Sequence, residues 1–372
     1  MTDPRHVDVV VVGAGIAGLT AARTVLAAGR AVAVHEARGR VGGRLLSVTG
    51  DSGVVDLGAA WFWPNEPHVQ ALAEQLGVGT FEQSLAGDAM FEADGRRAQR
   101  ISGNPIDVRS GRFTHGAQAL CQRAAEQLPP GTLRLADPVT AVHVQEDRVV
   151  VQAASGTVSA SHVVLALPPA LAVDSISFAP ELPEPARILA ANTAVWMGAI
   201  TKAVAVYDGA FWRDDGLAGA AVSHRGPFHE LHDHSGPDAR PAAIFGFAGS
   251  DQFPEATATQ LAAAFMAQLT RLFGPQAASP RQVHVVDWSR ERWTSPTSPS
   301  PRASTTTYSH PQLQEPLLGR LHWASTETAP AYAGHIEGAI RAGTLTANTI
   351  VRLLDAAPDS APDAADPLTS QR

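Results

Sequence analysis

Hydrophobic residues change their spacing twice near the start of the chain. Residues 7–12 (VDVVVV) form a near-continuous β-branched run, which predicts a parallel strand buried on both faces. Residues 16–29 (IAGLTAARTVLAAG) repeat apolar positions at helical spacing, and Gly29 suits the end of that helix. Residues 31–36 (AVAVHE) return to a strand pattern. Strand, helix and strand in this order predict a βαβ unit and an α/β fold.

Glycines occupy the joint between the first strand and the helix. Gly13 permits a tight turn, Gly15 lets a pyrophosphate approach the backbone, and Gly18 lets the helix pack closely on the strand. Glu36 ends the second strand, where a carboxylate can bind ribose hydroxyls. The pattern predicts a dinucleotide with a free ribose, FAD or NAD, although glycines also serve plain βαβ turns that bind nothing.

A second strand pattern carries an unusual cation. In residues 198–209 (GAITKAVAVYDG) the alternation places Ile200, Lys202, Val204 and Val206 on one face. A buried amine is costly without a partner or a role. Either this is an edge strand whose lysine reaches water, or Lys202 works inside the protein.

Composition narrows the class of protein. The chain has 372 residues, of which 45% are hydrophobic and 17% charged, as in a compact globular enzyme. A net charge of −8 argues against nucleic acid as a partner. Cys121 is the only cysteine, so no intramolecular disulfide forms. We find no signal-peptide pattern and no membrane span, and expect a cytoplasmic protein with a disordered tail at 357–372.

Further motifs decide between the dinucleotides. Residues 36–47 (EARGRVGGRLLS) add a Gly-Gly pair flanked by Arg40 and Arg44, enough for more backbone donors and a cation on a diphosphate. With this segment, the chain resembles the flavin-containing amine oxidase family, which includes monoamine and polyamine oxidases. Four further blocks are similar to that family and occur in its order, namely VDLGAAWFWP (55–64), VVLALPP (163–169), ITKAVAVYDGAFW (200–212) and LHWASTETAPAYAGHIEGAIRAG (321–343).

The resemblance implies that the cofactor is FAD. Around the ADP part it places Gly13, Gly15, Gly18, Glu36, Arg38, Gly43 and Arg44, with the Val139 backbone at adenine. Ala60 and Trp61 would lie by the flavin ring, Glu327 on the ribityl chain and the Ile336 amide near the pyrimidine edge. The segment after Gly334 also has helical periodicity, so its first amides suit the negative charge of a reduced flavin.

The same resemblance implies a Rossmann-like FAD-binding domain and a discontinuous α+β substrate domain. We expect the FAD-binding domain to contain residues 1–65, 112–175 and 315–356. The substrate domain would then contain residues 66–111 and 176–314.

By resemblance, Lys202 is the catalytic residue. A lysine in this block typically holds a water at flavin N5, and we expect Lys202 to aid the reaction of the reduced flavin with oxygen. The cofactor carries the redox chemistry, so the protein mainly positions an uncharged amine.

The chain departs from the family in its aromatic residues. Two rings often flank the amine, but here His335 stands where a tyrosine is common, and the second position is either Ser298 or Thr305, neither of which is aromatic. Trp61, Trp63 or Tyr332 would have to rebuild this cage. No cysteine lies in the 293–308 loop, so we expect non-covalent FAD.

A second departure is length. Only 47 residues separate WFWP from RFTHGAQAL, where larger members carry a helical subdomain that roofs the cavity. We expect a more open site, a bulkier substrate, or a roof supplied by a second copy in a homodimer.

Histidines in SHRGPFHELHDHSG (223–236) raise the question of a metal. The segment lacks the HExxH spacing, and strand alternation puts His229 and His232 on opposite faces, so we expect no metal. As in the family, the strand would line the pocket, which makes His229, and Phe247 in AAIFGF, candidates for substrate contact. His335 is a further candidate, unless it only starts a helix. Trp288 and Trp293 are expected in the core.

These observations together favour an FAD-dependent amine oxidase. It would oxidise a C–N bond to an imine and reduce O2 to H2O2. One alternative is a flavin oxidase or dehydrogenase of a non-amine substrate, such as a reduced nicotinamide isomer in renalase-like proteins or a C–C bond to be desaturated. Another is a flavin-binding protein without turnover.

Overall fold

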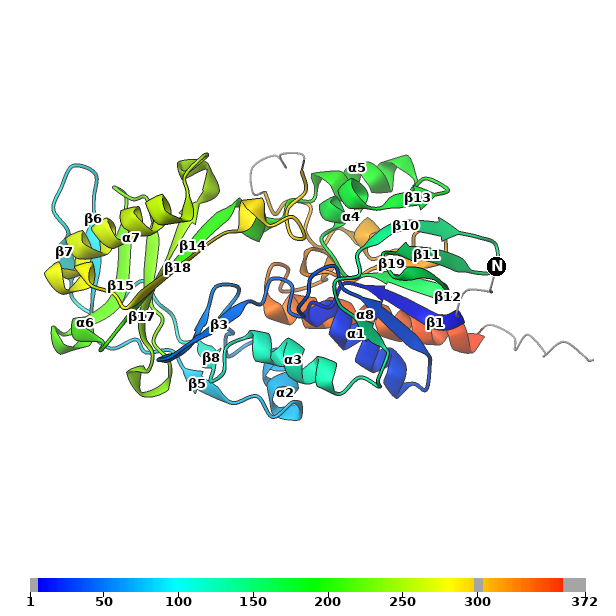
Figure 1. The fold of residues 1–372 in the computed structure, drawn as a ribbon, viewed down its shortest axis with the longest axis horizontal. Coiled ribbons are helices and arrows are strands. Elements are labelled where there is room, and N and C mark those ends of the chain that lie inside the picture. The colour runs from blue at the N-terminus through cyan, green and yellow to red at the C-terminus, as the bar shows by residue number, and fades with distance from the viewer. Residues whose placement is uncertain (1–5, 298–303, 357–372) are drawn as a thin grey trace, which may run out of the picture.

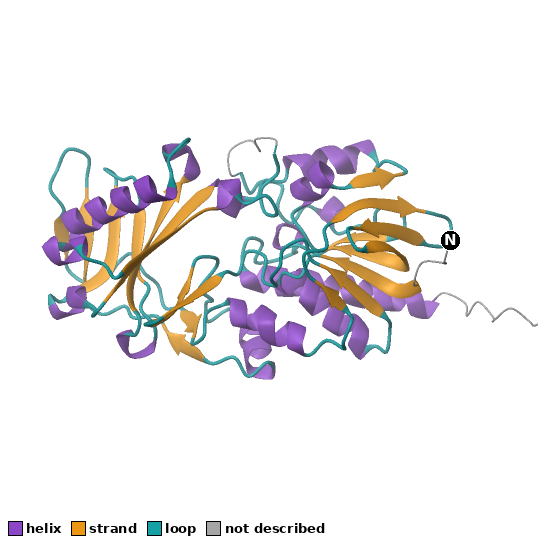
Figure 2. Cartoon of the chain, viewed as in Figure 1, coloured by secondary structure: helices purple, strands orange, loops and turns teal. Residues whose placement is uncertain are grey.

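Two large β-sheets stand at opposite ends of the molecule within residues 6–297 and 304–356, which this computed structural model describes (Figures 1 and 2). Loops and short hairpins connect the two sheets. The predicted tail at 357–372 lies outside the described residues.

The first sheet contains the predicted βαβ unit. β1 pairs in parallel with β12 on one side and β2 on the other, and the β1 segment Val9–Val11 has no solvent exposure, which confirms the predicted buried strand. In spatial order the strands are β13 (Ser177–Ala179), β10 (Val139–Val144), β11 (Val149–Ala153), β12 (Gly156–Leu165), β1 (His6–Val12), β2 (Val32–His35) and β9 (Leu133–Arg134), while β19 (Leu321–Trp323) also pairs with β12.

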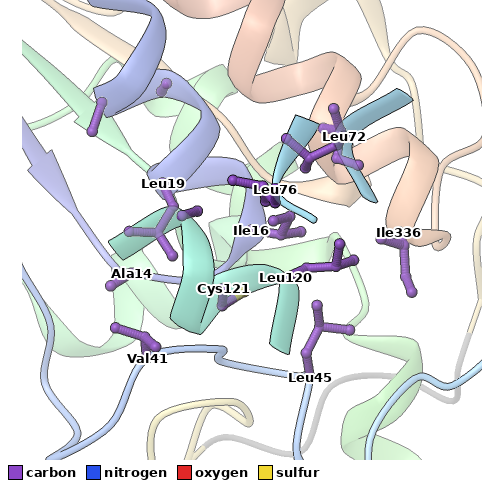
Figure 3. Packing of buried hydrophobic residues seen from close by; sticks show 14 of the residues in the cluster. Ala14, Ile16, Leu19, Val41, Leu45, Leu72, Leu76, Leu120, Cys121 and Ile336 are labelled. Carbon is purple, nitrogen blue, oxygen red and sulfur yellow. The ribbon is translucent and has the colours of Figure 1, made fainter. Parts of the chain in front are cut away.

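Helices cover both faces of this sheet. On one face they are α1 (Ile16–Ala27), α2 (Pro67–Gln75), α3 (Gln118–Glu126) and α8 (Ile336–Ala356). A Cβ added to Gly343 of α8 would lie 2.2 Å from the Ala17 carbonyl oxygen, so α1 and α8 touch through their backbones. Figure 3 shows side chains of these helices packed together. The other face carries α4 (Pro169–Ser175) and α5 (Glu184–Asn192).

The second sheet is mostly antiparallel. The alternation along β14 sends Ala203 and Ala205 toward α7, and Val204 and Val206 toward the middle of the molecule. In spatial order the strands are β18 (Gln282–Asp287), β14 (Ile200–Tyr207), β17 (Ala242–Gly249), β16 (Glu230–Asp233), β15 (Leu217–Ser223), β6 (Asp88–Glu92) and β7 (Gln99–Ile101), with α6 (Phe211–Asp214) and α7 (Ala258–Phe273) on the outer face. Figure 1 shows α7 lying across this face.

Two small antiparallel strand pairs lie between the large sheets. β3 (Ser47–Gly50) pairs with β4 (Gly53–Asp56), and β5 (Thr80–Glu82) pairs with β8 (Gly111–Phe113). Val55 and Leu57 pack against Val204 and Phe245 of the second sheet. The β4 segment, which follows β2 of the first sheet in the chain, therefore packs its side chains against the second sheet.

Two segments lie differently from the predicted domain limits. β13 pairs with β10 of the first sheet, and Ala186 and Ala190 of α5 join the same core, although residues 176 onward were assigned to the substrate domain. Residues 66–111 divide in the same way, because α2 packs on the first sheet while β6 and β7 extend the second. The packing of apolar faces sets where these segments lie, and the spacing of the motifs carries no information about that packing. The division into two functional domains stays a prediction.

Candidate active site

A cavity of about 420 Å³ lies between the two sheets and is lined from both. The first sheet contributes the ends of β1 and β2 and the first turns of α1 and α8. The second sheet contributes residues of β16 and β17. Crevices at the carboxyl ends of parallel strands are the usual place for a ligand in such folds.

The turn from β1 to α1 forms one wall of the cavity. Gly13 has φ +106°, and a Cβ there would lie 2.6 Å from the Ala166 carbonyl oxygen. A Cβ on Gly18 would lie 2.1 Å from the Gly13 carbonyl oxygen, so the spacing permits the predicted close packing. At Gly15 an added Cβ would meet only the Gly42 carbonyl oxygen, 3.9 Å away. The missing side chain leaves open space beside the α1 N-terminus, which suits an anionic diphosphate.

Glu36 directly follows β2 and lies buried at the cavity wall. Its Oε2 accepts a hydrogen bond from the Ala14 amide at 2.7 Å, and its Oε1 accepts one from the Arg38 amide at 2.8 Å. These bonds tie the ends of β1 and β2 together and fix the carboxylate in place. Val139 lines the same end of the cavity. The position fits the predicted ribose contact, which stays a prediction.

Two arginines line the same part of the cavity. Arg38 donates to Glu291 Oε2 at 2.9 Å and to Thr294 Oγ1 at 2.8 Å. Arg44 forms a bidentate ion pair with Glu327, which has no solvent exposure. Burial acts to raise the pKa of Glu327, but the Arg44 charge holds that pKa below its ordinary value. Gly43, with φ +56°, also lines the cavity beside Arg44.

The turn before α8 is held by one hydroxyl group. Thr326 Oγ1 accepts a hydrogen bond from the Gly334 amide and donates one to the His335 carbonyl oxygen, each at 2.8 Å. α8 then begins at Ile336, which lines the cavity, so the predicted helix after Gly334 is confirmed. The first amides of a helix lack partners inside it, which leaves them able to meet a negative group in the cavity.

Lys202 lies on β14 between β18 and β17, so it is not on an edge strand. Its side chain has no solvent exposure, which excludes the alternative in which the ammonium reaches water. Nζ donates to the Gly58 carbonyl oxygen at 2.5 Å. Burial lowers the pKa of Lys202 to about 7, although the nearby Asp56 carboxylate opposes that shift.

An aromatic cluster surrounds this lysine. Lys202 Nζ lies 4.3 Å from the centre of the Phe245 ring, 5.5 Å from Trp61 and 5.6 Å from Phe247. Ala60, Trp61 and Phe247 line the cavity in front of it. Cation–π contacts therefore replace part of the hydration that the buried ammonium loses.

Three of the other candidates for substrate contact group around His335, whose ring lies 6.3 Å from that of Tyr332. His335 lines the cavity, with its ring 5.0 Å from that of Trp63 and its Nδ1 2.6 Å from Glu66 Oε1. Tyr332 has φ +56° and donates its hydroxyl to the Asn65 carbonyl oxygen, and it does not line the cavity. Of the two candidates for the second ring position, Ser298 lies outside the described residues, and Thr305 is exposed and does not line the cavity.

Several residues of the cavity were not predicted. The cavity wall carries Glu230 and His232 instead of His229, whose Nδ1 lies 3.2 Å from the Ser223 carbonyl oxygen. Alternation along β16 places Glu230 and His232 on one face and could have identified them. Asp107 comes from a loop, where no periodic signal exists.

Two tryptophans expected in the core differ from each other. Trp288 is fully buried and donates Nε1 to the Leu57 carbonyl oxygen at 3.0 Å, as predicted. Trp293 instead lines the cavity, with the Arg292 guanidinium 4.4 Å from the centre of its ring.

The described residues contain no cluster of histidine, cysteine or acidic side chains that could hold a metal ion. No helix among them is long and apolar enough to span a membrane.

A comparison with protein families accounts for this arrangement. The family described as "Flavin containing amine oxidoreductase" matches residues 16–112 and 106–351. The chain belongs to this family. As a flavin-containing amine oxidoreductase, it is an enzyme that uses a flavin to oxidise amines, and the predicted α/β fold is confirmed.

Relatives of this amine oxidoreductase align along almost its whole length. A Mycobacterium tuberculosis protein named as a flavin-containing monoamine oxidase is 29% identical, over 94% of this chain and 98% of its own. Putrescine oxidase of Kocuria rosea is 25% identical, over 94% and 98%. A solved putrescine oxidase with putrescine bound has a TM-score of 0.83 and 25% identity, over 93% of this chain and 99% of its own.

The comparison also bears on the length of this amine oxidoreductase. The alignment with the M. tuberculosis protein spans 451 positions, more than the 372 residues of the chain. The relative therefore carries segments that this chain lacks. The family match divides at residues 106–112, within the stretch where the sequence predicts that a helical subdomain is absent.

Proposed function

We propose that this amine oxidoreductase binds FAD without a covalent bond and uses O2 as its electron acceptor. The amine would lose two electrons and two protons from its C–N bond to give an imine, which water hydrolyses. O2 would take up the two electrons and two protons as H2O2. Lys202 is the observation that carries this proposal, since the fold buries a cation among aromatic rings directly behind the cavity wall.

The polar groups of the cavity support a dinucleotide. Open space at Gly15 lies beside the α1 N-terminus, and Glu36 presents a fixed carboxylate at the end of β2. Cys121 is buried in α3 among apolar side chains (Figure 3). The only thiol of the sequence therefore lies outside the cavity lining, which supports non-covalent binding.

The chain's own residues would hold and orient the amine. A bound flavin supplies the two-electron acceptor. Trp61 and Phe247 form an apolar wall that favours the uncharged form of the reacting amine. Lys202 would hold a proton and a positive charge near the site of oxygen reduction, and the α8 N-terminus would stabilise negative charge.

The mouth of the cavity supports the predicted homodimer or a bulky substrate. Val108 and Trp196 line the cavity, yet their exposed fractions are 63% and 37%. Exposed apolar side chains at the edge of a binding cavity suit contact with another apolar surface. A second copy or a large substituent of the substrate would cover them.

Anaerobic bleaching of the flavin tests the proposal. The purified holoenzyme is mixed without oxygen with primary, secondary and polyamines and with reduced nicotinamides, and air is then admitted while H2O2 is assayed. Bleaching by an amine, followed by stoichiometric H2O2, is the expected result. Bleaching by nicotinamides alone would overturn the proposal in favour of the renalase-like alternative. A flavin that no compound bleaches would indicate binding without turnover.

A further inference from the structure

Three side chains, two from β16 and one from a loop, form an acidic cluster on the cavity wall. His232 Nδ1 lies 2.6 Å from Asp107 Oδ1, and His232 Nε2 lies 3.8 Å from Glu230 Oε2. All three residues line the cavity. We call Asp107, Glu230 and His232 the acidic cluster.

The acidic cluster keeps a net negative charge. Burial acts to lower the pKa of His232, but the hydrogen-bonded Asp107 carboxylate and the nearby Glu230 carboxylate raise that pKa above its ordinary value. Even with His232 protonated, two carboxylates face one cation. The arginines among the described lining residues are Arg38 and Arg44, whose guanidinium groups pair with Glu291 and Glu327 and not with the acidic cluster.

Glu230 is the member with unused hydrogen-bonding capacity. Asp107 is engaged through both oxygens, because Oδ2 also accepts from Asn104 Nδ2 at 2.8 Å. The Glu230 side chain is 61% exposed, and its carboxylate is 3.8 Å from His232, longer than a hydrogen bond. An ammonium or guanidinium group in the cavity would meet this carboxylate first.

Strand register sets the span between Glu230 and Lys202. Phe247 on β17 pairs with Lys202 on one side and with Glu230 on the other, so the three residues form one row across adjacent strands. Residues paired in register project from the same face of a sheet. Two strand spacings separate the Cα atoms of Lys202 and Glu230, which is about 10 Å. The aromatic rings of Trp61 and Phe247 line the cavity between them.

We propose that the acidic cluster binds a second cationic group of the substrate, so that the enzyme prefers diamines to monoamines and disfavours amino acids. This inference rests on the proposed function. The uncharged amine would lie at the aromatic wall, and an alkyl chain along Trp61 and Phe247 would carry the second ammonium to Glu230. A substrate carboxylate placed there would be repelled by the acidic cluster.

Matched substrates and charge-neutral variants test the inference. We measure kcat/KM for a series of diaminoalkanes of increasing length. Each diaminoalkane is compared with the alkylamine in which a methyl group replaces one of its two terminal amines. We expect the diamine to be favoured in the wild type, and Glu230→Gln to lower its kcat/KM about tenfold while the monoamine value changes little. Glu255→Gln, which removes an exposed carboxylate away from the cavity, is the matched control.

A binding measurement separates recognition from turnover. Hexamethonium, a bis-quaternary cation that has no oxidisable amine, is titrated calorimetrically into the holoenzyme, with hexyltrimethylammonium for comparison. Weaker hexamethonium binding by Glu230→Gln than by Glu255→Gln is expected, and flavin content and melting temperature verify that both variants fold. If kcat/KM is equal for diamines and monoamines, and Glu230→Gln changes neither value, this inference is wrong while the proposed function stands. A wild type that no amine bleaches would instead overturn the proposed function.

Discussion

At the scale of single residues, buried charge is the strongest signal of function in this chain. Lys202 and Glu327 are both fully buried, but they are stabilised differently. Glu327 has the Arg44 guanidinium as a direct partner, whereas Lys202 has a carbonyl oxygen and aromatic rings. A lysine without a carboxylate in direct contact can change protonation near neutral pH, which an ion pair resists.

Replacing Lys202 tests its predicted role with oxygen. We expect Lys202→Met to slow reoxidation of the reduced enzyme about a hundredfold, because a positive charge near the site is lost, while reduction by substrate changes much less. In the wild type the lysine is charged below pH 7 and neutral above it, so reoxidation should slow as pH rises through about 7. Stopped-flow measurements resolve the two half-reactions. An unchanged reoxidation rate in the variant would remove the assigned role.

Replacing Glu36 tests the ribose contact. Glu36→Ala should weaken FAD binding about tenfold or more, because a fixed carboxylate that accepts hydrogen bonds is lost. The ratio of flavin to protein after gel filtration, and fluorescence titration of the apoprotein, measure this effect. Glu36→Gln is the control, since its amide oxygen keeps part of the bonding to Ala14. Full flavin occupancy in the alanine variant would contradict the assignment.

Replacing His335 tests whether this residue contacts the substrate at the position where a tyrosine is common in the family. His335→Ala removes a ring that lies on Trp63 and binds Glu66, both near the start of α8. We expect kcat/KM ratios between amines to change by about tenfold while FAD stays bound. A substrate profile identical to that of the wild type would place His335 among residues that only support the helix start.

At the scale of elements, the pairing of β12 with β19 joins distant parts of the sequence. His162 and His322 on these strands are both buried, with ring nitrogens 3.1 Å apart. Burial, followed by the neighbouring His162, lowers the pKa of His322 to about 3. The folded protein therefore keeps the His322 ring neutral where an unfolded chain would bind a proton.

Stability should fall in mild acid because of this pair. Between pH 7 and pH 5, unfolded His322 takes up a proton that the folded state excludes, which reduces the free energy of unfolding by about 2 kcal/mol. Urea unfolding at both pH values measures this difference. In His322→Asn the free energy of unfolding should fall by about 2 kcal/mol less between pH 7 and pH 5 than in the wild type. In His143→Asn, which changes an exposed position on β10, it should fall as much as in the wild type. Parallel losses in all three proteins would show that the pair does not cause the acid sensitivity.

At the scale of the whole molecule, the short chain leaves the cavity mouth with exposed apolar residues. Val108 and Trp196 lie where the cavity opens, and the relative from M. tuberculosis aligns over more positions than this chain has. We expect the absence of the segments that this relative carries to change access to the site, while the two sheets that build the site remain.

This openness predicts tolerance of large substituents. We expect kcat/KM for 3,3-diphenylpropylamine to stay within about tenfold of that for 3-phenylpropylamine, because a steric wall would discriminate more strongly. Oxygen consumption measures both values. A loss of about a hundredfold would show that the mouth is covered, and sedimentation velocity would then establish whether a second copy provides the cover.

The sequence by itself determined the elements whose chemistry is local. The run of valines, the glycines after it and the second strand predict β1, α1 and β2 because backbone geometry and helix termini depend on near neighbours. The alternation around Lys202 likewise predicts a cation on an apolar face, since strand period is a local property.

Only the tertiary structure decided which distant residues share the cavity. Asp107 comes from a loop and Glu230 from β16, and contacts with His232 bring them together. The face of β16 that meets the cavity, and the exclusion of Lys202 from a sheet edge, depend on pairing with β17 and β18. Such pairings are set by burial of whole apolar faces and not by the spacing of any motif, so the sequence alone could not place them.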